Sequence, residues 1–146
     1  MNFLLDHLVL NCTNVEKMLE FYRTVCGFTA ERVEMYRAGK APFPSVRVNQ
    51  DTIIDLFPGK LPRTESHGEK EGTNLNHFCL SVCKEDWFML CEKLGQLGVL
   101  IEQGPVERWG AHGTGVSIYF RDPELNLIEV RYYENLTDSE VCLLET

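Results

Sequence analysis

A chain of 146 residues has the usual size of one domain, and its 44% hydrophobic and 25% charged residues are an ordinary globular balance. The formal net charge of −8 argues against sequence-independent binding to nucleic acid or to an anionic membrane surface, because both need a basic footprint. The sequence opens with no basic and apolar leader, and no apolar run approaches the roughly 20 residues that span a bilayer. We therefore expect one soluble, cytoplasmic domain over residues 1–146.

The first half of the chain predicts a strand, a helix and three further strands. Phe3 to Leu10 reads as a strand. Thr13 would begin a capping box with Glu16, apolar residues then recur at helical spacing, and Gly27 would end the helix. The three strand-like stretches that follow are residues 29–36, 45–49 and 52–57.

The second half repeats this order. Residues 76–82 predict a strand, an apolar stripe from Trp87 to Leu97 predicts a helix, and Gly98 would end it. Strand-like stretches follow at residues 100–103, 115–121 and 127–133. The fold class is therefore α+β, with two βαβββ modules. Module one would cover about residues 1–57, a linker 58–75, module two 76–134, and a C-terminal tail 135–146.

Each module would cover one face of its sheet with its helix and leave the other face bare. Pairing the bare faces would form a curved sheet around a cup. By strand alternation, His7 and His77 point into this cup from the first strand of each module, and Glu129 points into it from the last strand. Asp55 takes the place of Glu129 in the corresponding strand of module one.

Two imidazoles and one carboxylate are a ligand set that holds a divalent metal and leaves coordination positions open. A single histidine in a strand is more often a satisfied core residue, but two at matched positions of a repeat, with a matched carboxylate, favour a metal. Glu129 could instead form a salt bridge with Arg131 or Arg121.

A second group of candidates concerns catalysis. Residues 104–115 are rich in glycine and predict a mobile loop over the cup, which would carry His112. His112 is either an acid/base or substrate contact or a solvated loop histidine. Tyr119 falls on the cup side of its strand and could donate a hydrogen bond to a bound oxyanion, although ordinary strand packing is the alternative.

A third group concerns substrate binding. Ser117 and Arg121 alternate onto the same side as Tyr119, and Arg47 lies in the corresponding part of module one. Arg47 and Arg121 could hold a substrate carboxylate, but surface pairing with acidic residues is an equal alternative.

Several stretches carry a resemblance to a known family. They are Leu5-Asp6-His7-Leu8-Val9-Leu10, Phe21-Tyr22 with Gly27-Phe28, Gly104-Pro105-Val106-Glu107-Arg108, Ser117-Ile118-Tyr119-Phe120-Arg121-Asp122-Pro123 and Asn126-Leu127-Ile128-Glu129. In these the sequence resembles the vicinal oxygen chelate superfamily, the glyoxalase/bleomycin-resistance/extradiol-dioxygenase group. The resemblance implies a fold of two βαβββ modules and one divalent metal ion per chain (Fe, Mn, Ni or Zn), held by His7, His77 and Glu129.

The sequence departs from the family pattern at two positions. Leu125 stands where the turn before the last strand usually carries glycine, so a positive φ there would cost energy. Asp55 stands where glyoxalase and epimerase relatives carry a longer Glu or Gln as a fourth ligand, and it could reach the metal directly or only through water. Family members closest to the extradiol dioxygenases bind the metal through three protein ligands.

The resemblance implies a metal-dependent enzyme for a small-molecule substrate that chelates the metal through adjacent oxygens. The short Asp55 slightly favours a ring-cleavage dioxygenase over a glyoxalase-like lyase, isomerase or epimerase. A fosfomycin-modifying transferase ranks lower, because the tail lacks the basic residues expected to hold phosphonate. A drug-binding protein of the bleomycin-resistance kind is the non-enzyme alternative, but such proteins lack the metal triad. Relatives of this fold commonly pair, so we expect a homodimer.

Overall fold

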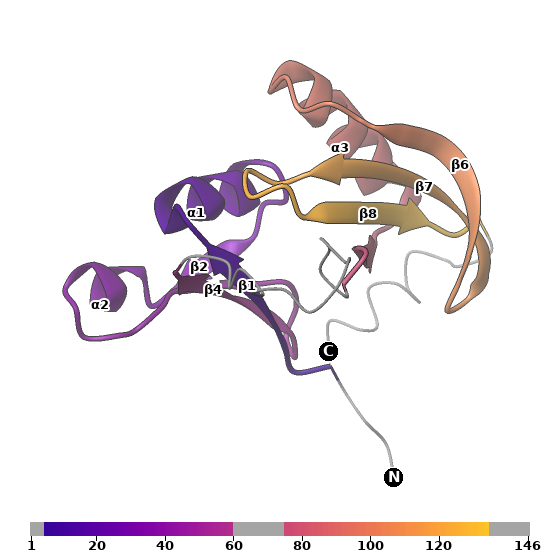
Figure 1. Cartoon of the computed structure of the whole chain (residues 1–146). Helices are drawn as coiled ribbons and strands as arrows, with labels where there is room; N and C mark the ends of the chain where they lie inside the picture. The colour runs from indigo at the N-terminus through magenta and orange to yellow at the C-terminus, as the bar shows by residue number, and fades with distance from the viewer. Residues whose placement is uncertain (1–4, 60–74, 135–146) are drawn as a thin grey trace, which may run out of the picture. The chain divides into compact units, whose positions relative to one another are not determined.

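The computed structural model describes residues 5–59 and 75–134, which belong to two compact units, Met1–Gly72 and Thr73–Thr146 (Figure 1). Each unit carries one four-stranded sheet with its helices, which confirms the α+β class and the two modules. Most of the predicted linker and the predicted tail lie outside the described residues. The single domain and the cup concern the relation between the units and stay predictions. No helix among the described residues is long and apolar enough to cross a membrane.

The first module forms a sheet of order β1-β4-β3-β2, in which β1 and β4 are parallel and the other neighbours antiparallel. Its elements are β1 (His7–Cys12), α1 (Val15–Thr24), β2 (Thr29–Glu31), α2 (Val33–Arg37), β3 (Ser45–Arg47) and β4 (Ile53–Pro58). The apolar side of α1 is buried at Met18, Leu19 and Tyr22, and the covered sheet positions include Leu10 and Ile54. Helical and strand periodicity thus place one core between α1 and one face of the sheet.

Two local predictions for this module are wrong. Asn14, not Thr13, caps α1: its side chain accepts from the backbone N–H of Lys17 at 3.0 Å. Glu16, in the first turn of α1, binds Arg37 through both carboxylate oxygens, at 3.0 and 2.8 Å.

The predicted strand over residues 29–36 is also shorter than expected. It ends at Glu31, because Arg32 has a left-handed backbone with φ 61° and turns the chain into α2.

The second module repeats the topology, with sheet order β5-β8-β7-β6 and a parallel pair of β5 and β8. Its elements are β5 (Phe78–Ser81), α3 (Lys84–Gln96), β6 (Gln103–Gly110), β7 (Gly113–Arg121) and β8 (Leu127–Tyr132). Trp87, in α3, is buried, and its indole N–H donates to the Val130 carbonyl at 3.0 Å. This bond ties the helix to β8.

The predicted mobile loop over residues 104–115 is wrong, and the strand expected at 100–103 begins only at Gln103. The segment forms the β6–β7 hairpin, with Arg108 opposite Gly115 and Gly110 opposite Gly113. A Cβ at Gly104 would overlap the Ser117 carbonyl oxygen, so this strand needs glycine for close backbone approach. Trp109, near the tip, is 82% exposed.

The turn before β8 has the conformation expected from the family pattern. Leu125 has φ 67° and is 70% exposed. The Asp122 carboxylate accepts from the backbone N–H groups of Glu124 and Asn126 at 2.9 and 3.0 Å. The turn therefore keeps its geometry through Asp122 while Leu125 bears the strain.

Candidate metal and substrate site

The two modules place their candidate ligands at equivalent positions. Asp55 lies opposite Val9 across β1 and β4, and Glu129 lies opposite Cys79 across β5 and β8. Both carboxylates are buried, at 7% and 2% exposure. Strand register thus confirms the predicted equivalence of Asp55 and Glu129, each on the strand beside its histidine-bearing segment.

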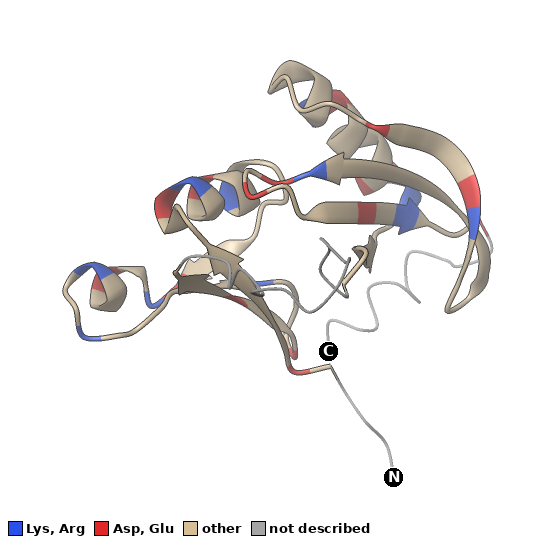
Figure 2. Ribbon diagram, in the orientation of Figure 1, with Lys and Arg blue, Asp and Glu red and all other residues tan. Residues whose placement is uncertain are grey.

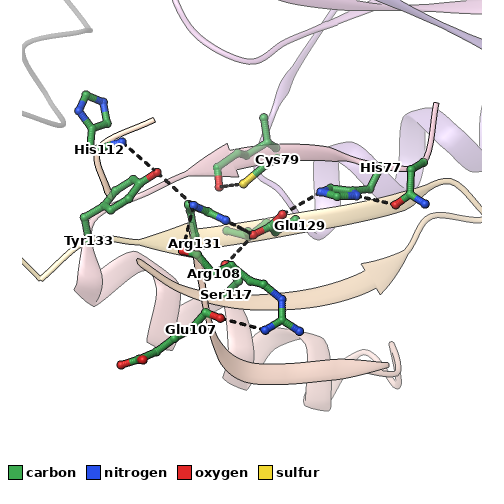
Figure 3. A network of polar contacts seen from close by, with 12 residues as sticks. His77, Cys79, Glu107, Arg108, His112, Ser117, Glu129, Arg131 and Tyr133 are labelled. Atoms are coloured by element: carbon green, nitrogen blue, oxygen red, sulfur yellow. Dashed lines mark hydrogen bonds and ion pairs between the residues drawn. The ribbon is translucent and has the colours of Figure 1, made fainter. Parts of the chain in front are cut away.

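In the second module, His77 and Glu129 face each other (Figure 3). His77 Nε2 lies 3.0 Å from Glu129 Oε2. His77 Nδ1 lies 2.7 Å from the amide oxygen of Asn76. The second oxygen of Glu129, Oε1, accepts from the Ser117 hydroxyl at 2.6 Å and from Arg131 Nε at 3.2 Å. Glu129 Oε2 is therefore the oxygen directed at the imidazole.

The charge state of Glu129 is fixed by its neighbours. Burial alone would raise the pKa of this carboxyl, but hydrogen bonds from Ser117 and Arg131 outweigh burial and hold the pKa below its ordinary value. Burial would likewise lower the pKa of Arg131, yet its bonds with Glu129 and Tyr133 raise it. The site therefore contains a buried carboxylate and a buried guanidinium, both ionised at neutral pH.

Tyr119 and Cys79 complete this cluster. Tyr119 lies directly opposite Glu129 across β7 and β8, and its ring meets the His77 ring edge-on at 5.6 Å. Burial and a hydrogen bond to Glu129 raise the pKa of the Tyr119 phenol, and burial and the Glu129 charge raise the pKa of the Cys79 thiol to about 11. Both groups are thus protonated at neutral pH and can act as hydrogen-bond donors.

A pocket of about 500 Å³ opens beside His77. Its lining residues are Asn76, His77, Glu102, Gln103, Tyr119 and Leu127. An imidazole and a phenol therefore meet at a space large enough for a small molecule.

The first module has the same plan in a simpler form. His7 Nδ1 lies 2.6 Å from the Asp6 carboxylate, and the hydrogen bond with Asp6 raises the pKa of His7. The Ser45 hydroxyl donates to Asp55 at 2.6 Å. Each module thus has a histidine whose Nδ1 is bound by the preceding side chain, and a buried carboxylate held by a serine.

These donors fit a divalent metal ion. Binding of Nδ1 by Asp6 or Asn76 directs the Nε2 lone pair outward, as in metal sites whose ligands are held by outer-shell partners. A neutral imidazole has one N–H, but the two nitrogens of His77 face two acceptor oxygens, that of Asn76 and Oε2 of Glu129. A metal ion bound to Nε2 would take the place of the missing proton. Two ligands at right angles, each about 2.1 Å from a metal, lie about 3.0 Å apart. The separation of His77 Nε2 and Glu129 Oε2 is 3.0 Å.

The complete ligand set is not contained in one module. Within neither module, over the residues that the structure describes, do three or more His, Cys, Asp or Glu side chains gather as a metal site. A set of His7, His77 and Glu129 therefore needs both modules, and it stays a prediction.

His112 lies apart from the cluster of His77 and Glu129. It sits in the β6–β7 turn, and its ring packs edge-on against Tyr133 at 5.4 Å. The backbone N–H of His112 donates to the Tyr133 hydroxyl at 3.5 Å. That hydroxyl lies 3.2 Å from Arg131 Nη1. His112 thus reaches Glu129 only through two intervening side chains (Figure 3).

The arginines proposed for substrate binding are already paired. Arg47 is held by Glu31 and by the carbonyls of residues 49 and 50. Arg121 forms an ion pair with Glu102 at 2.7 Å and donates to the Leu125 carbonyl. Of the two alternatives for these arginines, the structure shows the surface pairing.

Sequence reasoning considered Arg131 only as a rival partner for Glu129. The structure shows the Arg131 ion pair together with the His77 contact, on different oxygens of one carboxylate. Alternation was the available signal, because Arg131 and Glu129 share one face of β8.

The chain consists of two βαβββ modules, which define a class of repeated-module α+β folds. Each module has a histidine before or at the start of its first strand and a carboxylate on the adjacent strand. The sequence profile of the Glyoxalase/Bleomycin resistance protein/Dioxygenase superfamily matches residues 4–130, so the chain belongs to this superfamily. The resemblance inferred from the sequence is thereby confirmed.

Individual relatives agree with this assignment. The virulence protein STM3117 of Salmonella typhimurium is 33% identical over 129 residues, covering 88% of this chain and 83% of that protein. Its crystal structure matches with a TM-score of 0.71 over 91% of this chain and 98% of that one, at 28% identity. A lactoylglutathione lyase of Neisseria meningitidis is 27% identical over 84% of this chain and 86% of its own length.

Proposed function

We propose that this chain is a divalent-metal-dependent enzyme acting on a small molecule that binds the metal through two adjacent oxygens. The observation that carries the proposal is the 3.0 Å pair of His77 Nε2 and Glu129 Oε2, whose other polar atoms are already bound. His7, His77 and Glu129 would hold one Fe, Mn, Ni or Zn ion, with Asp55 as a further ligand directly or through water. When bound, such an ion stabilises negative charge on a substrate oxygen.

The remaining residues would position groups and donate hydrogen bonds. Ser117 and Arg131 hold Glu129 Oε1 and so fix the orientation of the carboxylate. Tyr119 lies against His77 at the 500 Å³ pocket, where its phenol would shift its hydrogen bond from Glu129 to a substrate oxygen that gains charge. No role in proton transfer is assigned to His112, since it lies at the far end of the network.

We assign the chemistry to a redox-neutral lyase or isomerase. Matching relatives include proteins named lactoylglutathione lyase, and both modules carry a buried carboxylate at the same register position. Ring-cleavage dioxygenase chemistry, which the short Asp55 favours, is the second candidate. The observation in its favour is that Asp55, at the register position of Glu129, has a side chain one methylene shorter.

Metal analysis tests the site. Protein purified without added metal should contain one divalent ion per chain, and His77→Ala should lose it. His112→Ala is the matched histidine control and should keep it, because His112 touches neither His77 nor Glu129 in the described contacts. Stoichiometric metal in folded His77→Ala would exclude the proposed site.

Asp55 separates the two chemistries. In a lyase or isomerase with four protein ligands, Asp55→Ala should lower metal affinity as His7→Ala does. In a three-ligand dioxygenase site, Asp55→Ala should keep the metal while His7→Ala loses it. Oxygen uptake by the Fe(II)-loaded protein with a panel of catechols then tests the second candidate directly, and its absence supports the first.

A further inference from the structure

Arg108 lies on the same side of its sheet as the candidate site. It belongs to β6, where Val106 lies opposite Ser117 and Arg108 lies opposite Gly115. Alternation therefore puts Arg108 on the face that carries Ser117, and Ser117 holds Glu129. The Arg108 guanidinium also lies close to the Tyr119 phenol, on which its charge acts.

Arg108 differs in its partners from the arginines that pair with acidic residues. Four arginines are each held by a glutamate carboxylate: Arg37, Arg47, Arg121 and Arg131. Arg108 donates to the carbonyl oxygen of Glu107 at 2.9 Å and is hydrogen-bonded to the Tyr119 phenol, and over the part of the chain that the structure describes it forms no ion pair. A guanidinium has five N–H donors, so Arg108 has donors left for a ligand.

The residue directly opposite Arg108 is Gly115, which has no side chain to pair with the guanidinium. A Cβ at Gly115 would lie 2.7 Å from the Tyr132 carbonyl oxygen and 3.0 Å from the Tyr133 ring, so this position cannot take a larger residue without a shift. The cross-strand neighbour of Arg108 therefore brings no charged or hydrogen-bonding side chain to it.

Arg108 and Arg131 lie on one face of this sheet together with Glu129, in a chain with a net charge of −8. Glu107 and Arg108 are the charged residues of β6, and Glu129 and Arg131 those of β8 (Figure 2). A planar guanidinium without a carboxylate partner among the described residues matches a carboxylate, which it can bind through two parallel hydrogen bonds.

We propose that Arg108 binds a carboxylate of the substrate, so that the substrate is a carboxylic acid carrying two adjacent oxygen ligands. This inference rests on the proposed function, because it assumes that the adjacent oxygens bind at His77 and Glu129. Arg108 then selects acids over neutral molecules with the same chelating pair.

The test uses catechol probes that differ only in charge. The protein is saturated with Zn²⁺, and calorimetry measures the affinities of 2,3- and 3,4-dihydroxybenzoate and of the two corresponding amides. Wild type should bind at least one acid about tenfold more tightly than its amide, as expected for charge-assisted hydrogen bonds. Arg108→Gln should abolish this preference and leave the affinity for the amide unchanged.

Arg37→Gln is the control, because Arg37 is an exposed arginine of the first module that pairs with Glu16 and Glu34. It should keep the preference for the acid. If Arg108→Gln keeps the preference, or loses amide binding as well, the role of Arg108 is overturned. If acids and amides bind wild type equally, the role of Arg108 is overturned, while the proposed binding of the two adjacent oxygens to the metal is supported. If none of the four probes binds, the proposed function fails and this inference falls with it.

Discussion

The buried pair of Glu129 and Arg131 gives the most direct test of the site's energetics. Their exposed fractions are 2% and 4%, and Arg131→Met would leave the carboxylate buried without its guanidinium partner. Loss of one partner of a buried ion pair costs about 3–5 kcal/mol. We expect a loss of this size in the free energy of unfolding, measured by urea denaturation in the presence of a chelator.

The double variant separates pairing from packing. Glu129→Gln alone leaves the guanidinium unpaired, whereas Arg131→Met with Glu129→Gln removes both charges. The double variant should lose about 2 kcal/mol less free energy of unfolding than the two single variants lose together, within the range for residues in direct contact. The exposed Arg37→Met is the control and should cost less than about 1 kcal/mol. The pairing of Arg131 with Glu129 would be refuted if the losses in free energy of unfolding are additive, or if Arg131→Met costs no more than Arg37→Met.

Three further predictions concern the turn, the hairpin and the assembly. Leu125→Gly should raise the free energy of unfolding by about 0.5–1 kcal/mol, because glycine relieves the strain at φ 67°, and a lower thermal midpoint would contradict this. Gly104→Ala should destabilise by at least about 2 kcal/mol, since the new Cβ overlaps the Ser117 carbonyl, whereas Gly95→Ala, in open space within α3, should be neutral or stabilising. Urea denaturation of both glycine variants decides this comparison. Light scattering should give twice the 16.8 kDa chain mass at micromolar concentration, and a monomer mass would reject the homodimer.

Strand alternation accounts for the part of the site that the sequence could predict. The side-chain period of two is local, so it put Glu129 on one face of its strand without knowledge of the partner strands. The equivalence of Asp55 and Glu129 followed from matching apolar neighbours and agrees with the register of both sheets.

The β6–β7 hairpin could not be predicted because its glycines have a tertiary cause. Glycine is depleted in strands, so residues 104–115 predicted a loop. A Cβ at Gly110 would overlap Arg131, in β8, and Tyr133, directly after it, and the sequence gives no local sign of that contact.

The positions of Trp87 and Trp109 make the second module optically distinct. They are the two tryptophans of the chain, one buried and bonded to β8, the other 82% exposed near the hairpin tip. Selective excitation of indole fluorescence should therefore report on the second module and leave the first silent. Trp87 should emit at short wavelength and be shielded from aqueous quenchers, while Trp109 should emit at long wavelength and be quenched readily. Unfolding followed at the two wavelengths would then resolve the sheet from the hairpin tip without any added label.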